Sequence, residues 1–109
     1  MYARVWKLNI LPGQVEKFTA AAENMMPLLR RQPGFRGCLV LRSGPGELEA
    51  TVVSTWASID ALRESETPLF QQALVEFLSH CERHPFMREE EVVISEFVSK
   101  DPDDTVTKF

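Results

Sequence analysis

The fold is decided by one stretch near the start of the chain, Val5-Trp6-Lys7-Leu8-Asn9-Ile10-Leu11-Pro12-Gly13-Gln14-Val15-Glu16-Lys17-Phe18. Between Tyr2 and Ile10 the even positions are mostly apolar, whereas Lys7 and Asn9 are not, and this alternation is typical of a strand with two different faces. Pro12-Gly13 ends that strand. Apolar residues then recur every three or four positions, which predicts a helix with one apolar stripe: Val15, Phe18, Ala22, Met25, Met26 and Leu29.

The next segment reads as a hairpin. The helix is expected to bend near Pro27 and to end at Gln32-Pro33-Gly34. Two β-rich runs follow, Phe35 to Arg42 and Leu48 to Trp56, and the loop between them is too short for anything but an antiparallel turn.

The last third of the chain is expected to hold two helices and a strand. Ser58 is a typical N-cap for a short helix to Arg63, and Thr67-Pro68 begins a longer helix towards Cys81. The acidic run Glu89-Glu90-Glu91 is expected in a solvated turn, and the β-branched residues from Glu91 to Val98 predict the final strand.

This order predicts an α+β domain of the ferredoxin-like β-α-β-β-α-β type, a four-stranded antiparallel sheet with helices on one face. Residues 1–99 would form the domain and residues 100–109 a flexible acidic tail. The other sheet face still carries apolar residues, including Val5, Val53 and Phe97, so we expect two sheets to meet in a homodimer.

Composition excludes several classes of partner. The chain has 109 residues, 44% of them hydrophobic, and a net charge of -4 with scattered basic residues, so a nucleic-acid partner is not expected. No apolar run is long enough for a membrane span and no signal segment opens the sequence, which predicts a cytoplasmic protein without a membrane partner. Cys38 and Cys81 have no metal-type spacing and are expected as small buried residues.

Three segments resemble the antibiotic biosynthesis monooxygenase family. The opening stretch is similar to the strand, Pro-Gly and helix with which these domains begin. Pro33-Gly34-Phe35-Arg36-Gly37-Cys38 resembles their entry to the second strand, and the run from Val52 to Leu62 resembles their third strand, which ends in a tryptophan, here Trp56. The likeness covers about the first three quarters of the chain in the right order.

The resemblance implies a dimeric α/β barrel with a cavity between sheet and helices. Members of this family include cofactor-free oxygenases that act on aromatic or quinol substrates, haem-degrading enzymes, and proteins without an assigned role. The resemblance therefore implies one of these three possibilities. The functional positions of the haem-degrading branch fall here on Trp6, Ser65 and about Leu74, and none of its residues is kept. Haem degradation is therefore disfavoured, and no fingerprint for a nucleotide or flavin cofactor is present, so no cofactor is predicted.

The candidate catalytic residues are Arg4 and His80. Arg4 shares a strand face with Trp6, so it either stabilises a substrate anion or ends the strand in water. His80 falls near the apolar stripe of the long helix and is the candidate general base. With His84 it also suggests a metal site, but Pro85 ends the helix there and further ligands are lacking, so an ordinary helix terminus is favoured and no metal is predicted.

A small apolar or aromatic molecule is the expected ligand, and its contacts are expected to be Trp6, Phe18, Trp56, Phe70, Leu74 and Phe77. Each of these also has a simpler reading as a core side chain. Two functions remain open. One is a cofactor-independent monooxygenase that oxidises a quinol or polycyclic phenol with O2; the other is a non-catalytic, dimeric small-molecule-binding or stress-related protein of the same fold.

Overall fold

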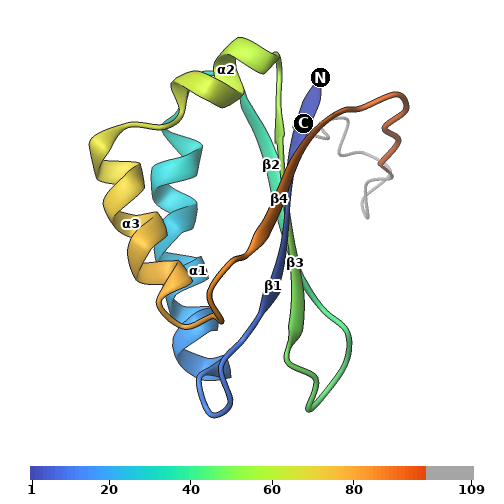
Figure 1. Cartoon of the computed structure of the whole chain (residues 1–109). Coiled ribbons are helices and arrows are strands. Elements are labelled where there is room, and N and C mark those ends of the chain that lie inside the picture. Colours follow the sequence, from blue (N-terminus) through green and yellow to red (C-terminus); the bar gives the residue numbers. More distant parts are fainter. Residues whose placement is uncertain (98–109) are drawn as a thin grey trace, which may run out of the picture.

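The computed structural model describes residues 1–97, which form one sheet covered on one face by helices (Figure 1). The elements follow in the order β1 (Tyr2–Asn9), α1 (Val15–Arg30), β2 (Phe35–Arg42), β3 (Glu49–Trp56), α2 (Ile59–Glu64), α3 (Pro68–Leu78) and β4 (Phe86–Glu91). All strand pairs are antiparallel and the spatial order is β2-β3-β1-β4. The predicted α+β, ferredoxin-like class is confirmed, and the tail predicted for residues 100–109 lies outside the described residues.

The opening stretch forms the first strand and the first helix, as predicted, and the strand is one of the two inner strands of the sheet. β1 pairs with β3 on one side and with β4 on the other, so it positions the whole sheet. Gly13 has a φ of 78° in the turn after the strand, a backbone conformation that residues with a Cβ rarely adopt. The helix continues through Pro27 and ends at Arg30.

Both later helices begin at the residues expected from their capping chemistry. The Ser58 hydroxyl accepts a hydrogen bond from the Ala61 amide at 3.1 Å, and the Thr67 hydroxyl accepts one from the Phe70 amide at 3.3 Å. Pro68 occupies the first turn of α3, where its missing N–H removes no helical bond. The first cap therefore fixes where α2 begins after β3, and the second fixes where α3 begins.

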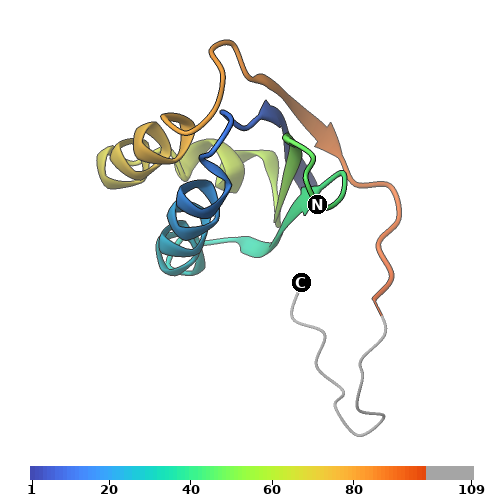
Figure 2. The same cartoon turned by 90° about the horizontal axis from the view of Figure 1, so that it is seen from below.

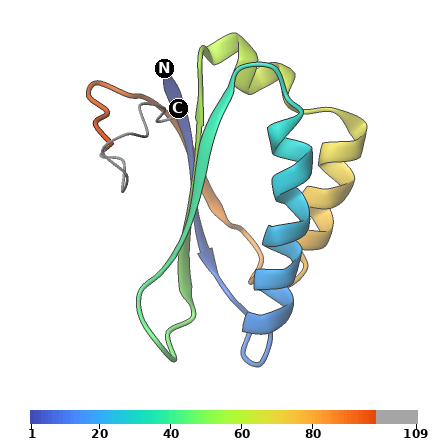
Figure 3. The same cartoon turned by 180° about the vertical axis from the view of Figure 1, so that it is seen from behind.

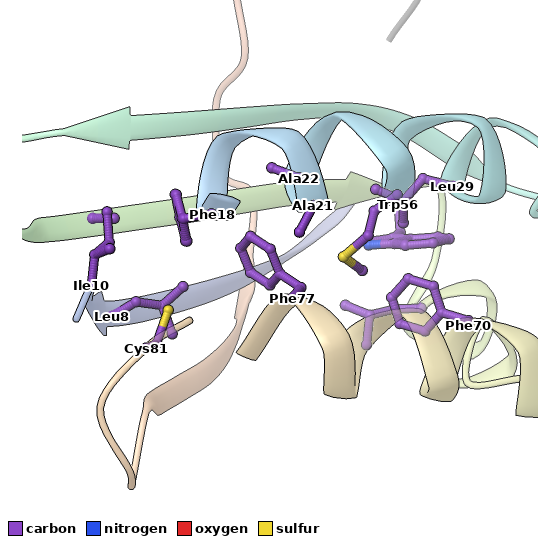
Figure 4. Packing of buried hydrophobic residues seen from close by; sticks show 13 residues of the cluster. Leu8, Ile10, Phe18, Ala21, Ala22, Leu29, Trp56, Phe70, Phe77 and Cys81 are labelled. Carbon is purple, nitrogen blue, oxygen red and sulfur yellow. The ribbon is translucent and has the colours of Figure 1, made fainter. Parts of the chain in front are cut away.

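The core lies between the sheet and the pair α1 and α3 (Figure 4). Phe18 of α1 and Phe77 of α3 are in ring contact, with centroids 4.8 Å apart. Trp56, at the end of β3, lies near Leu29 and Phe70 and is almost fully buried. Burial of each large apolar side chain contributes about 2 kcal/mol to folding, so this layer supplies most of the driving force.

The final strand differs from the prediction. It was expected over Glu91 to Val98, but β4 spans Phe86–Glu91 and therefore includes the acidic run that was expected in a turn. Backbone pairing outweighs side-chain propensity here. The short connection after α3 places Phe86 opposite Lys7, and the ladder runs on to the bond from the Val92 amide to the Met1 carbonyl.

The outward face of the sheet carries no helix (Figures 2 and 3). Leu39, Val53 and Val5 stand directly opposite one another on β2, β3 and β1 on this face, as the pairing registers require. Leu39, Leu41 and Phe86 are about half exposed. We refer to these five residues as the outward apolar patch.

The turn at Gly34 offers a test of how α2 is held against the start of β2. A Cβ at this position would lie 2.6 Å from the Ala61 Cβ, and Gly34 has a φ of 82°. Gly46 has the same φ with no atom within 4 Å, so it is a matched control. We expect Gly46→Ala to cost about 1 kcal/mol of unfolding free energy through backbone strain alone. Gly34→Ala should cost about 2 kcal/mol more through overlap, measured by urea denaturation. Equal losses of unfolding free energy in the two variants would contradict close packing of α2 against the turn at Gly34.

Candidate functional site

A partly open chamber lies between the inner face of the sheet and the helices, with a volume of about 40 Å³. From the sheet it is lined by Arg4, Trp6, Cys38, Val40, Val52, Ser54 and Trp56. From the helices it is lined by Ala22, Met25, Met26, Leu29, Phe70, Leu74 and Phe77. Its walls are almost wholly apolar, and the polar groups that reach it come mainly from one cross-strand row.

That row consists of Arg4, Ser54 and Cys38, which are paired across β1, β3 and β2. Side chains directly opposite one another in an antiparallel sheet share a face, so the three meet at one end of the chamber. The Ser54 hydroxyl accepts a hydrogen bond from Trp56 Nε1 at 3.0 Å. Ser54 thereby holds the Trp56 ring in place and remains the neutral polar neighbour of Arg4.

Arg4 is the charged group of the chamber, and its side chain is only 5% exposed. Its Nη2 atom donates to Oε1 of Glu66 at 2.9 Å, and Glu66 is 46% exposed in the connection between α2 and α3. Its Nε atom is buried and has no hydrogen-bond partner among the described residues. An unpaired buried donor costs about 1–3 kcal/mol, so this N–H is a site where an acceptor from a ligand would be favourable.

Five of the six predicted ligand contacts line the chamber: Trp6, Trp56, Phe70, Leu74 and Phe77. Phe18 does not line the chamber; its ring contacts Phe77 on the side away from Trp56 and Phe70 (Figure 4). Leu74 contributes an aliphatic wall to the chamber. Trp6 is only partly buried and lines the chamber with its neighbour Val52.

Sequence reasoning missed Ser54, Cys38, Met26 and Glu66. The first two could have been found from the hairpin register, since Ser54 is the cross-strand partner of Arg4 and Cys38 is the partner of Ser54. Met26 was assigned to the helix stripe without a functional role. Glu66 carried no local signal, because it reaches Arg4 only through the path of the chain between α2 and α3.

His80 does not line the chamber. It lies at the end of a separate hollow of about 280 Å³ between α1 and α3, which shares only Met25 with the chamber. Its Nδ1 atom is 3.1 Å from Oε1 of Gln14, and its Nε2 atom is 3.4 Å from Oε1 of Glu76. The structure therefore does not bring His80 together with Arg4, and a base role for His80 stays a prediction.

A second hollow adjoins the chamber along the edge of the sheet. This α1–β2 groove has a volume of about 320 Å³ and is lined by Phe18, Thr19, Ala22, Glu23, Met26, Val40, Leu41 and Arg42. It shares Ala22, Met26 and Val40 with the chamber. The groove and the chamber are therefore neighbours separated by side chains.

No group of three or more potential metal ligands is found within residues 1–97. In the same part of the chain no helix has the length and apolar character needed to cross a membrane.

The fold and the sheet-to-helix chamber define a class of small α+β domains, and sequence comparison identifies the family. The model for "Antibiotic biosynthesis monooxygenase" matches residues 1–76. The chain therefore belongs to the antibiotic biosynthesis monooxygenase family. No curated protein matches the sequence.

Solved structures support the same fold. SnoaB, a cofactor-independent oxygenase from Streptomyces nogalater, superposes with a TM-score of 0.76 at 17% identity, covering 86% of this chain and 94% of its own. A family protein from Bordetella bronchiseptica gives 0.74 at 21% identity, covering 85% and 97%. One from Caulobacter crescentus gives 0.75 at 21% identity, covering 85% and 90%. At these identities the likeness shows the fold alone.

The thiols provide a test of the chamber environment. Burial raises the pKa of Cys38 from 9.0 to about 11, and it raises the pKa of Cys81 equally. Native protein at pH 8 should therefore react with iodoacetamide about 100-fold more slowly than unfolded protein. The pKa of each thiol is higher in the folded protein than in the unfolded protein. The contribution of the neutral thiols to the free energy of unfolding is therefore fully present below pH 9 and is lost as the pH rises towards 11.

Single Cys38→Ser and Cys81→Ser variants assign the measured rates to each thiol. Rapid alkylation of native Cys38 at pH 8 would contradict an inert thiol and would indicate a nucleophile in the chamber.

Proposed function

We propose that this protein is a cofactor-independent monooxygenase that oxidises a quinol or polycyclic phenol with O2. The observation that carries the proposal is the buried Arg4, whose Nε donor has no partner among the described residues and whose side chain lines an apolar chamber. A phenolic oxygen placed there would accept this hydrogen bond. The adjacent positive charge would favour the phenolate over the phenol.

The chemistry requires no external reductant. A phenolate or enolate is electron-rich and can pass an electron to O2, after which a C–O bond forms between the two radicals. In the overall step one oxygen atom of O2 replaces the hydrogen of a ring C–H group, and the phenol loses its O–H hydrogen, so that a quinone forms. The second oxygen atom leaves as water together with these two hydrogens. Arg4 would stabilise the substrate anion, and the apolar walls would exclude water from the reactive intermediates.

Among the described residues, the chamber wall contains no carboxylate and no imidazole that could accept the phenol proton. His80 is the candidate base from the sequence, but it lies in the hollow between α1 and α3, behind Met25. A direct transfer from a substrate at Arg4 to His80 is therefore not supported by the geometry. Because Arg4 would lower the pKa of a bound phenol, part of the required deprotonation can occur without a protein base.

Oxygen uptake with 1,8-dihydroxyanthrone and 1,4-dihydroxynaphthalene tests the proposal, after subtraction of autoxidation. We expect Arg4→Met to lower kcat/KM about 10²-fold through loss of a buried donor to the developing anion, and Arg4→Lys to recover part of it. Arg30→Met, at the exposed end of α1, is the matched control and should keep wild-type activity. Wild-type protein that binds these compounds without catalysed oxygen uptake would overturn the enzymatic function.

That outcome would support the second candidate, a non-catalytic small-molecule-binding protein. The specific observation in its favour is that His80, the candidate base, lies in a hollow separate from the chamber that Arg4 lines, so the geometry offers a binding group without the candidate base beside it. Such a protein would bind an aromatic molecule at Arg4 but leave it unchanged.

We also propose that the working unit is a homodimer formed through the outward apolar patch. Leu39, Leu41 and Phe86 are half exposed on a sheet face that carries no helix. An extended apolar face on a small domain favours burial against a partner, and a second copy offers a self-complementary surface.

Size-exclusion chromatography with light scattering tests this assembly. Val53→Glu places a charge at the centre of the outward apolar patch and should convert a dimer into monomers, because a buried unpaired carboxylate is strongly unfavourable. Val75→Glu on the exposed side of α3, where Val75 is 69% exposed, is the control and should leave the mass unchanged. A monomeric wild-type protein would contradict the proposal.

A further inference from the structure

The volumes of the two adjoining hollows leave a question of substrate size. The chamber holds about 40 Å³, too little for a single aromatic ring. The α1–β2 groove holds about 320 Å³, which reaches the lower end of the ~300–1,000 Å³ typical of ligand sites. A polycyclic substrate that reaches Arg4 must therefore occupy both, and a side chain between them has to move.

We propose that Met26 is this partition and that it determines substrate size. The inference rests on the proposed function of the chamber. Three residues are shared by the two hollows, Ala22, Met26 and Val40. Alanine has no side chain to rotate, and Val40 is β-branched and paired with Val52 within the sheet. Met26 is unbranched, with three rotatable side-chain bonds, and it is only partly buried.

Met25 also adjoins the chamber, but it is a less suitable partition. Met25 is buried in the core, and its other neighbour is the hollow between α1 and α3, which it also lines. Its displacement would expose core surface, whereas Met26 sits at the boundary with a groove that is already open. Displacing Met26, which connects the chamber to the α1–β2 groove, therefore costs less free energy than displacing Met25.

The inner face of the sheet defines the shape of the ligand along this route. Three successive cross-strand rows are polar, apolar and mixed: Arg4–Ser54–Cys38, then Trp6–Val52–Val40, then Leu8–Ala50–Arg42. Rows on one face are two residues apart, so the first and third are separated by about 13 Å along the strand. This length suits fused rings and not a single ring.

The geometry thus specifies a class of substrate. Its oxygen-bearing ring lies at Arg4, its apolar middle passes Val40 once Met26 has turned aside, and its distal ring reaches the groove beside Arg42. Monocyclic phenols lack the length to gain from the groove. Fused aromatic phenols gain contact along both hollows.

Anaerobic calorimetric titration tests the inference without turnover, with phenol, 2-naphthol and 1,8-dihydroxyanthrone as probes. Met26→Ala opens the partition and should tighten binding of the anthrone about tenfold, with a smaller gain for phenol, which is too short to contact the groove. Met26→Phe fills it with a stiffer group and should weaken binding of the anthrone about tenfold. Met87→Ala is the control, since this methionine of β4 lines neither hollow.

The outcomes distinguish the partition from the oxygenase function. Opposite shifts for the two Met26 variants, larger for fused rings than for phenol, support the partition even if no oxygen is consumed, and in that case only the oxygenase function fails. Equal affinities of both Met26 variants and wild type for the anthrone would overturn the partition even in an active oxygenase. Failure of wild type to bind any of the three probes would contradict both.

Discussion

The contact between Arg4 and Glu66 is the interaction on which the chamber depends. A guanidinium in an apolar layer is costly unless a counter-charge offsets the lost hydration, and Glu66 supplies that charge from the connection between α2 and α3. Because Arg4 belongs to β1, one of the two inner strands, the pair ties this connection to the middle of the sheet. Within the described residues the same pair leaves Nε unsatisfied, so the arrangement stabilises the chamber end while retaining one donor there for a ligand.

Local signals predicted most of the fold because they coincide with the pairing of the strands. The alternation in β1, the stripe of α1 and the caps at Ser58 and Thr67 all describe interactions within a few residues, and the structure has them where they were expected. β4 is the exception. Its sequence from Phe86 to Glu91 is mainly charged and offers no apolar alternation, and only the backbone of β1 makes it a strand.

The site was predictable to the extent that it follows from face and register. Arg4 and Trp6 reach the chamber because alternate residues of one strand share a face. Phe18 and His80 failed to join them because a helical stripe is wider than a single cavity, so neighbours on the stripe can contact different hollows. The pairing of Arg4 with Glu66, 62 positions away, depends on the tertiary path and could not be read from spacing.

The outward apolar patch and the segment after β4 both carry apolar residues outside the helix-covered core. β2 reads Cys38-Leu39-Val40-Leu41 without alternation, a pattern typical of a strand with apolar residues on both faces. Within the described chain only the inner face is covered, by α1 and α3. Val93 and Ile94, which follow β4, are 85% and 83% exposed despite their strongly apolar character. Val93 and Ile94 are β-branched and favour a strand by propensity, which explains why propensity alone placed the final strand too late in the sequence.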